Sequence, residues 1–361
     1  MKITFVIYGD LETLSGGYVY DRHLLRYLKK CGDEVRVVSL WEGSYGRHML
    51  DNLSGASARA LTAGDPDVIV QDELCHPSLA LVNHRIRQIG APPIVSLVHH
   101  LLTDEEGPHS ARLLYKAMER LYFSGVDGIL ANTHITLSRV REVSHRDLPS
   151  AVAWPGGTLP GPPIPRTQLN DRLQQQRPLH ILFVGNLIER KLVHVLLTSV
   201  FDLLRRTDVR LTIVGGDELE PRYARRIKRI AKPLVEKGIV TFTGPKRDLE
   251  LAAMYTDADV LAVPSSYEGF GIVYLEGMAY GLPAIGTAAG GAREIIADNV
   301  NGFLVHPHDS SSLSRHLQQL AEDRGLLSRM SHAARDRFDR HPTWTQSMDN
   351  ARNFLLRMAK P

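Results

Sequence analysis

The chain has 361 residues, of which 43% are apolar or aromatic and 23% are charged, and its formal net charge is +3. This length is too great for one ordinary hydrophobic core and fits two domains of typical size. The small net charge gives no indication of a nucleic-acid partner, so we expect none. Cys31 and Cys75 lack metal-ligand spacing, which argues against a disulfide scaffold and favours a reducing compartment.

Residues 1–9 contain one lysine followed by a short apolar run. A signal peptide has a longer apolar segment and a small-residue cleavage site, so the pattern predicts a first buried strand. No apolar stretch is long enough to span a bilayer. We therefore expect a cytoplasmic protein, soluble or at most peripheral at the inner membrane surface.

Short β-branched runs alternate with helical patterns in the first half of the chain. The residues from Tyr20 to Cys31 place apolar side chains at i, i+3, i+4 and i+7, which predicts a helix that ends at Gly32. The expected strands are residues 3–7, 34–39, 68–70, 94–98 and 129–131. Strands that alternate with helices predict a parallel sheet covered on both faces.

Residues 154–165 hold too many prolines and glycines for a regular element, and the polar run 168–177 adds no apolar periodicity. A second alternation follows, with strands expected at residues 180–184, 210–214, 240–242, 260–263 and 284–286. We therefore predict two α/β domains, residues 1–160 and 161–340, with ligands bound in a cleft outside the carboxyl ends of the strands.

The segment 264–279 is the most informative for function. Glu268 follows the strand 260–263, and the glycines Gly269 and Gly271 let a ligand approach the backbone closely. A helix is expected to begin near Ile272, where free amides and the helix dipole suit a diphosphate, and Glu276 lies close enough to accept both hydroxyls of a ribose. The alternative is that Glu268 caps a helix and Glu276 is solvated, which the two glycines at a strand terminus disfavour.

This segment resembles the signature of retaining glycosyltransferase family 4, which has the GT-B fold of two Rossmann-like domains facing across a cleft. The shared pattern is proline-serine, then glutamate-glycine-phenylalanine-glycine, then a second glutamate after seven residues; Gly281-Leu282-Pro283, Gly290-Gly291, Glu294 and Asn301-Gly302-Phe303 continue it. The resemblance implies that Glu268 contacts the donor sugar, that Glu276 binds the ribose, and that the backbone of Phe270, Gly271 and Ile272 binds the diphosphate. It also implies a donor-binding second domain, an acceptor-binding first domain, and a closing helix within residues 341–361 that crosses back to the first domain.

Two further segments fit the family pattern. Ser15-Gly16-Gly17 follows the first strand, as the family's N-terminal glycine loop does, although a plain tight turn is the alternative. Residues 183–191 end a strand and lead into a predicted helix at 192–204, with Gly185, Asn186, Arg190 and Lys191 in the loop. Basic residues at a helix start are disfavoured by the dipole, which points to a bound pyrophosphate. The family has an arginine where this chain has Asn186, while Lys191 matches, so Arg190 is the candidate substitute; a merely solvated pair remains the alternative.

His99 and His100 follow the strand 94–98, and His99 aligns best with a family histidine near the reacting sugar. A structural histidine is the alternative.

Two Asp-x-Asp pairs, at residues 65–67 and 257–259, precede strands and so lie away from the ligand face; we interpret them as turns and caps and predict no required metal. The helix bearing Arg222 to Lys232 has a basic face, which is either solvated or attracted to an anionic membrane.

The sequence thus predicts a metal-independent, retaining hexosyltransferase that moves a sugar from a nucleoside diphosphate sugar to an acceptor hydroxyl. UDP is favoured over GDP and ADP on frequency alone. The acceptor is a sugar, a glycan, a lipid-linked molecule or another small molecule, and no further cofactor is expected. Catalytic roles are expected for His99, Lys191, Arg190 and Glu268. Two other classes stay open: a nucleotide-sugar epimerase on the same fold, and a non-catalytic sugar-binding protein.

Overall fold

The structure, a computed structural model, describes residues 1–13, 15–157 and 159–359. It divides the chain into two units, the first comprising Met1–Gly156 together with Pro342–Pro361 and the second comprising Gly157–His341. The change from the first unit to the second falls within the stretch 154–165, which contains no helix or strand wherever the structure describes it. Proline and glycine are thus used there to connect the units rather than to form an element.

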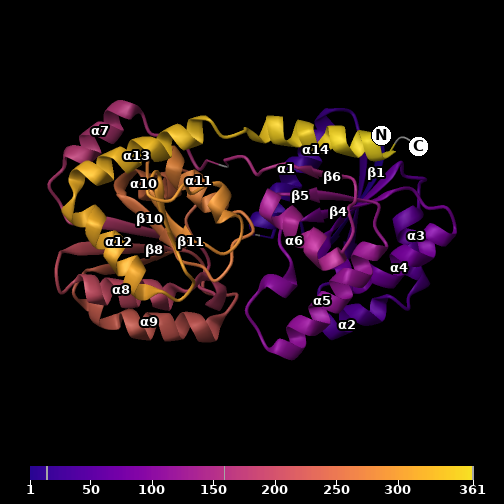
Figure 1. The fold of residues 1–361 in the computed structure, drawn as a ribbon, viewed down its shortest axis with the longest axis horizontal. Coiled ribbons are helices and arrows are strands. Elements are labelled where there is room, and N and C mark those ends of the chain that lie inside the picture. Colours follow the sequence, from indigo (N-terminus) through magenta and orange to yellow (C-terminus); the bar gives the residue numbers. More distant parts are fainter. Residues whose placement is uncertain (14, 158, 360–361) are drawn as a thin grey trace. The chain divides into compact units, whose positions relative to one another are not determined.

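The first unit is built on a parallel sheet (Figure 1), in which β1 pairs with both β2 and β3. The strand order is β2-β1-β3-β4-β5-β6. The strands are β1 (Lys2–Tyr8), β2 (Glu34–Leu40), β3 (Val68–Asp72), β4 (Ile94–Val98), β5 (Gly128–Ala131) and β6 (Ser150–Val152). The helices are α1 (Gly16–Lys30), α2 (Tyr45–Asp51), α3 (Gly55–Thr62), α4 (His76–Gln88), α5 (His109–Ser124), α6 (His134–Ser144) and α14 (Trp344–Ala359), with short 3₁₀-helices η1 (Glu73–Cys75) and η2 (Leu102–Asp104).

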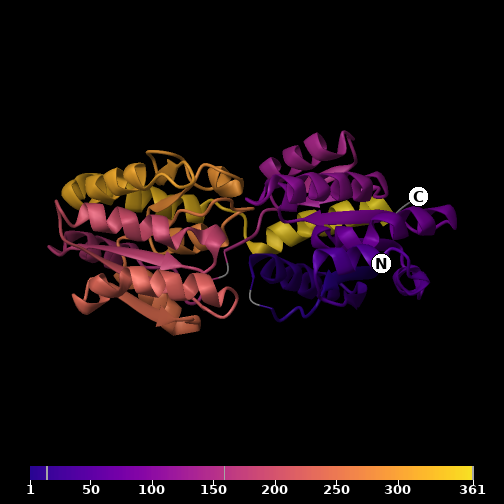
Figure 2. The same cartoon turned by 90° about the horizontal axis from the view of Figure 1, so that it is seen from below.

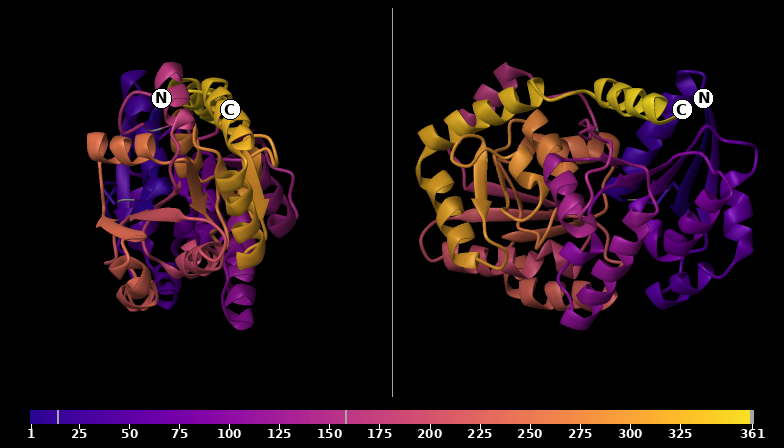
Figure 3. Two further views of the ribbon diagram at one scale, coloured as in Figure 1. Left: turned by 90° about the vertical axis from the view of Figure 1, so that its left-hand side faces the viewer. Right: turned by 45° about the vertical axis from the view of Figure 1, so that its right-hand side comes forward.

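Each face of this sheet has its own hydrophobic core. Alternate residues of β1 point to opposite faces, so that Phe5 packs on one side and Val6 on the other. The core that contains Val6 is closed by α3, α4, α5 and α6, and the core that contains Phe5 is closed by α1 and α14. Helix α14 lies along α1 in two views (Figures 1 and 3), so the end of the chain completes the core that its beginning starts.

The second unit has a parallel sheet of the order β12-β11-β10-β7-β8-β9, in which β7 pairs with β8 and β10. Seen from below, helices cover both faces of each sheet (Figure 2). The strands are β7 (Leu179–Val184), β8 (Val209–Val214), β9 (Val240–Gly244), β10 (Val260–Val263), β11 (Ala284–Thr287) and β12 (Gly302–Val305). The helices are α7 (Arg166–Gln174), α8 (Val193–Leu203), α9 (Pro221–Glu236), α10 (Asp248–Asp257), α11 (Ile272–Ala279), α12 (Ser310–Glu322) and α13 (Arg324–Asp339), with η3 (Glu189–Lys191) and η4 (Gly291–Glu294).

The predicted architecture of two Rossmann-like α/β domains with parallel sheets is confirmed, and the differences lie in short elements. Strands β6 and β12 were not predicted, because each is only three or four residues long and shows no alternation of its own. The polar run 168–177, which shows no apolar periodicity, overlaps α7, of which only Leu169 and Arg172 are buried. A helix with so narrow a buried face leaves little periodicity to detect.

The C-terminal segment expected to return to the first domain forms α14 and belongs to the first unit; residues 360–361 of that expectation lie outside the described residues. Among the described helices, none combines the length and apolar character needed to cross a membrane. Both cysteines are free thiols, Cys31 exposed and Cys75 buried.

Candidate functional site

The loops after β7 and β10 meet at the point where the strand order of the second sheet reverses. Numbered within the unit, this order is 3-2-1-4-5-6 read from β9 to β12, so β7 and β10 flank the topological switch point. In open α/β sheets, ligands bind outside the carboxyl ends of the strands at this point. The loop after β10 carries Glu268, and the loop after β7 carries Arg190 and Lys191.

Glu268 is the centre of an ion cluster in the second unit. Lys191 Nζ lies 2.5 Å from its Oε1, and the Ser265 hydroxyl donates to the same oxygen at 2.5 Å. Arg190 Nη1 lies 3.8 Å from Oε2. Burial alone would raise the pKa of Glu268, but the charges of Lys191 and then Arg190 lower it to about 2, so this carboxylate is ionised. The structure thus brings together three residues that the sequence placed in separate motifs.

The backbone of Glu268 is fixed by the glycine pair that follows β11. Gly291 N–H donates to the Glu268 carbonyl at 2.7 Å, and Glu268 forms an isolated bridge with Gly290. Gly290 has φ of +86°, and a Cβ there would lie 2.1 Å from the Glu268 carbonyl oxygen. Only glycine permits this approach, which gives a physical reason for the glycine that the family pattern has at position 290.

Helix α11 begins directly after the Glu268 loop, as predicted. Gly271 precedes it with φ of +83°, and a Cβ there would meet the Tyr274 ring at 2.4 Å. The Phe270 ring is buried, 5.7 Å from that of His341, so this residue offers its backbone rather than its side chain. The amides of Ile272 and its neighbour stand at the open end of the helix, where the dipole favours an anion. Gly269 is half-buried just before them.

Glu276, the predicted ribose ligand, is half-buried in α11 and accepts a hydrogen bond from the Tyr255 hydroxyl at 2.8 Å. Burial raises its pKa to about 7, and the Tyr255 hydrogen bond opposes that rise. Tyr255 is fully buried in α10, stacked on Tyr280 with ring centroids 5.3 Å apart. We did not single out Tyr255 from the sequence, since a tyrosine on the inner side of a helix reads as a core residue.

Arg190 and Lys191 occupy the turn η3 rather than the start of the helix. Leu192 follows in the left-handed region, with φ of +49°, and α8 begins only at Val193. The expectation that the pair stands at the helix start is therefore corrected: the left-handed residue separates them, so the dipole of α8 is not the reason for two cations here. The Arg190 guanidinium donates to the Tyr267 carbonyl at 2.8 Å, which directs it to the Glu268 loop.

Asn186 points to a different neighbour. Its Oδ1 accepts from Gly216 N–H at 3.3 Å, and Leu187 N–H donates to the Gly216 carbonyl at 2.8 Å. Asn186 thus ties the loop after β7 to the loop after β8. Gly185 precedes it at φ of +154°, and a Cβ there would lie 3.6 Å from Lys191 Cε. The cation that the family pattern places at this position is missing, and Arg190 is the residue whose charge lies beside Lys191.

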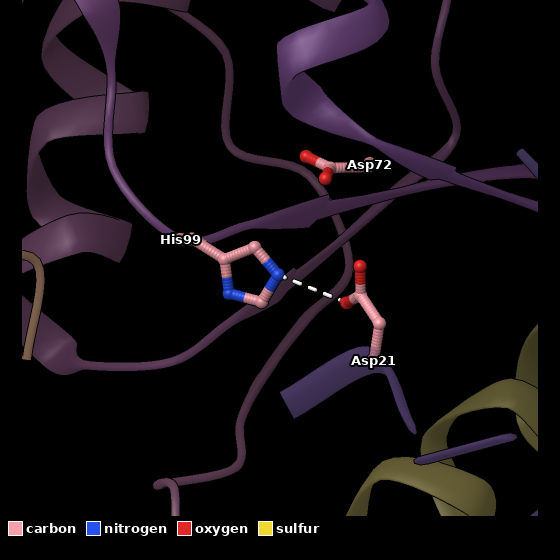
Figure 4. A group of neighbouring side chains, drawn as sticks. All are labelled: Asp21, Asp72 and His99. Atoms are coloured by element: carbon pink, nitrogen blue, oxygen red, sulfur yellow. Dashed lines mark hydrogen bonds and ion pairs between the residues drawn. The ribbon is translucent and has the colours of Figure 1, made fainter. Parts of the chain in front are cut away.

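In the first unit, the predicted glycine loop and His99 also meet. Gly16 and Gly17 are the first residues of α1, whose N-cap Ser15 accepts from Tyr18 N–H at 3.4 Å. A Cβ on Gly17 would lie 3.1 Å from His99 Cδ2. His99 Nε2 lies 3.0 Å from Oδ1 of Asp21, one turn further along α1 (Figure 4).

Asp72, at the end of β3, completes this second cluster (Figure 4). Burial lowers the pKa of His99, but Asp21 outweighs it and the net pKa is raised. Burial and then Asp21 raise the pKa of Asp72 to about 6. His100 instead pairs with Glu105 at 3.0 Å, which distinguishes the two histidines. Neither Asp21 nor Asp72 was singled out from the sequence, although Asp72 stands at a strand's carboxyl end, where ligands bind.

Comparison with known proteins agrees with this geometry. Residues 166–337 match the family model described as glycosyl transferases group 1. A D-inositol 3-phosphate glycosyltransferase from Xylanimonas cellulosilytica is 36% identical over 181 residues, which are 48% of this chain and 43% of that protein. Residues 166–337, most of the second unit, are therefore similar to the glycosyl transferases group 1. The chain spans less than half the length of that curated relative.

Solved structures show that this chain has the GT-B fold. Sucrose-phosphate synthase from Thermosynechococcus elongatus matches with a TM-score of 0.76 at 21% identity, covering 99% of this chain and 97% of that one. Anabaena HepE, in complex with UDP-glucose, matches with a TM-score of 0.76 at 19% identity, covering 99% and 100% of the two chains. At these identities the likeness shows the fold alone.

The two Asp-x-Asp pairs lie at the amino ends of β3 and β10, as expected. Asp67 accepts from Lys2 N–H at 2.6 Å, and Asp259 accepts from His180 N–H at 2.9 Å. Both therefore cap neighbouring strands. On α9, the predicted basic face is exposed opposite the buried residues Tyr223 and Ile227, and Arg226 lies 3.6 Å from Glu189.

Proposed function

We propose that this chain transfers a glycosyl group from a nucleoside diphosphate sugar to an acceptor hydroxyl, with retention of configuration and without a metal ion. One observation carries the proposal: Lys191 and Arg190 converge on the ionised Glu268 beside the open end of α11. Two cations and one carboxylate leave one positive charge, and the helix dipole adds to it. A diphosphate is the anion that this surplus suits.

Each residue then has a role. Glu268 accepts a hydroxyl of the donor sugar, and the backbone from Phe270 to Ile272 binds the diphosphate. Lys191 exchanges Glu268 for a phosphate oxygen and stabilises the charge of the leaving group, with Arg190 taking the part of the arginine that Asn186 replaces. Removing one such preorganised group costs on the order of a hundred- to a thousandfold in rate. The leaving phosphate itself deprotonates the acceptor.

UDP is the proposed nucleotide. HepE structures that contain UDP and UDP-glucose support this choice, since HepE has the same fold over its whole length. Glu276 is the proposed ribose ligand. The relatives named D-inositol 3-phosphate glycosyltransferase support a hydroxyl group as the acceptor.

The first unit is proposed to bind the acceptor and to contribute His99 and the backbone of Gly16 and Gly17 to the reaction. This assignment is supported by the family resemblance and by the contact between the glycine segment and His99. The basic face of α9 carries Arg222, Arg225 and Lys232, all exposed. For an acceptor linked to lipid, that face would draw the protein to an anionic membrane surface.

Thermal denaturation with UDP, GDP and ADP tests the donor site. A ligand at a hundred times its dissociation constant adds about 2.7 kcal/mol of stability. We expect UDP to raise the melting temperature most, and we expect Glu268→Gln and Lys191→Ala to reduce that rise. The half-buried Lys246, paired with Glu250 in the same unit, provides the matched control Lys246→Ala. If no nucleoside diphosphate stabilises the wild-type protein, the proposal is wrong.

Incubation with UDP-sugars separates the proposal from its alternatives. With donor alone we expect slow hydrolysis, and with an acceptor panel we expect a glycoside whose anomeric configuration matches the donor by NMR. Epimer formation would indicate the epimerase, and binding without turnover would indicate the sugar-binding protein. Activity unchanged by EDTA is the expected result for a reaction without metal.

A further inference from the structure

We propose that Asp21 is a positioning residue that holds the His99 ring in the orientation needed for the reaction. The inference rests on the proposed function in one respect, namely that His99 acts on the substrate. It names a residue outside the motifs that indicated the function, and it concerns α1 rather than the loops after β7 and β10.

The first argument is that the two ring nitrogens of His99 have different surroundings. Nε2 lies 3.0 Å from Asp21 Oδ1, while Nδ1 has no hydrogen-bond partner among the described residues. Figure 4 shows Nε2 turned to Asp21 and Nδ1 turned away from both carboxylates. With an acceptor at Nε2, that nitrogen carries the proton, and Nδ1 is the nitrogen left to meet a ligand.

The second argument is that the ring is held on its other sides as well. A Cβ on Gly17 would lie 3.1 Å from His99 Cδ2, and the Tyr20 ring meets it edge-on with centroids 5.2 Å apart. Asn132 donates from Nδ2 to the His99 carbonyl at 2.9 Å. Gly17, Tyr20 and Asp21 all belong to the first turns of α1, so one short segment determines where the imidazole points.

The third argument is that Asp21 makes too few hydrogen bonds for a residue that only stabilises the core. It is fully buried, and its Oδ2 has no hydrogen-bond partner in the part of the chain that the structure describes. Burying a carboxylate costs stability unless its oxygens are bonded, and an apolar residue would close the core at less cost. The ion pair with His99 offsets part of the cost of burying this carboxylate. The presence of Asp21 is therefore explained by its interaction with His99.

The charged groups around His99 set the expected pH response. They are Asp21 on α1, Asp72 at the end of β3, Glu73 directly after it, and His100 next to His99 in the chain. Asp21 favours the protonated imidazole, so its removal lowers the pKa of His99.

Asp21→Asn is the central variant, and Asp72→Asn is its matched control, because it removes a charge from the same cluster without a hydrogen bond to His99. We expect Asp21→Asn to lower kcat about ten- to a hundredfold, as for other residues that orient a reacting group, with little change in the donor KM. We expect its acid limb in the pH profile of kcat to move to lower pH. In a His99→Gln background, Asp21→Asn should lower kcat no further. Equal losses in Asp21→Asn and Asp72→Asn, or additive losses with His99→Gln, would overturn the proposal.

A second measurement does not depend on activity. Nitrogen-15 NMR of the imidazoles, assigned by the signal lost in His99→Gln, should show His99 protonated on Nε2 and titrating at higher pH in wild type than in Asp21→Asn. Identical His99 signals in the two proteins would refute the positioning role even if Asp21→Asn loses activity through poor folding. If the wild type transfers no sugar, the proposed function fails, while this spectrum still decides the role of Asp21.

Discussion

The two units build their candidate sites at the same topological place but from differently distributed residues. In each sheet the loops in question follow the strands at the reversal of strand order, β7 and β10 in the second unit and β1 and β3 in the first. The second unit draws its residues from two contiguous segments, whereas the first unit combines α1 with the ends of β3 and β4. A switch point thus locates a site in both, but only a contiguous motif identifies its chemistry.

The buried acids of the two units also differ in charge. Glu268 has two cations beside it, and its pKa falls to about 2. In the first unit, burial raises the pKa of Glu73 and of Glu119 to about 8, and that of Asp72 to about 6. The Glu268 cluster therefore offers fixed charges to an anion, while Glu73, Glu119 and Asp72 of the first unit hold protons near neutral pH. Substitutions that act differently in the two units test this contrast.

The largest effect is expected for Lys191→Ala in the second unit. Losing the cation that faces the leaving group should lower kcat on the order of a hundred- to a thousandfold. Steady-state kinetics with the best UDP-sugar measures it, and Lys246→Ala should leave kcat unchanged. If Lys191→Ala changes only the affinity for the donor and keeps the full kcat, the ion cluster has no catalytic role.

The next effect is structural. Gly290→Ala places a Cβ 2.1 Å from the Glu268 carbonyl oxygen at φ of +86°, and overpacking of this kind costs about 3 kcal/mol. Gly238→Ala is the control, because Gly238 also has positive φ, +70°, but its Cβ would have nothing within 4 Å. Denaturant unfolding should show the larger loss for Gly290→Ala. Equal losses of stability in the two variants would show that positive φ causes both, and that the close approach of Gly290 to Glu268 contributes nothing.

A smaller effect concerns the pH dependence of donor binding. Burial raises the pKa of Glu276 to about 7, and its ionised form is the proposed acceptor of the ribose hydroxyls, so affinity should fall as pH drops below 7. Calorimetry should give roughly tenfold weaker binding at pH 6 than at pH 8, one pKa unit being 1.36 kcal/mol. Tyr255→Phe removes a hydrogen bond that lowers this pKa, so the fall should begin at higher pH. Glu276→Gln should bind weakly at every pH; a wild-type profile as flat as that of the variant would contradict the ribose assignment.

The smallest effect is expected for Gly17→Ala in the first unit. Its Cβ would meet a side-chain ring at 3.1 Å rather than backbone, and alanine favours the helix by up to about 1 kcal/mol. The melting temperature should therefore hold while kcat falls a few-fold, because the His99 ring shifts. A marked loss of stability, as in Gly290→Ala, would show that the two glycines serve the same purpose.

The sequence was sufficient for the parallel sheets and for the order of strand, loop and helix around Glu268, because both depend on local order. A buried strand followed by Glu268, two glycines and a helix is visible in one segment. The roles of Asp21 and Tyr255 could not be predicted, because they depend on contacts between segments that are distant in the chain. Each lies on a helix whose pattern indicates packing, and its partner is distant in the chain, His99 for one and Glu276 for the other. Pairs of this kind depend on how helices pack on the sheet, which periodicity does not specify.

The position of α14 bears on the order in which the chain acquires its structure during synthesis. Met348, Phe354 and Leu355 belong to the same core as Phe5, although the whole second unit separates them in sequence. Ribosomes add about 5–20 residues per second, so the second unit takes on the order of ten to forty seconds to emerge. During that interval one face of the first sheet lacks its last helix. The second unit, being continuous, can close its core first, and the nascent first unit is the part exposed to chaperones.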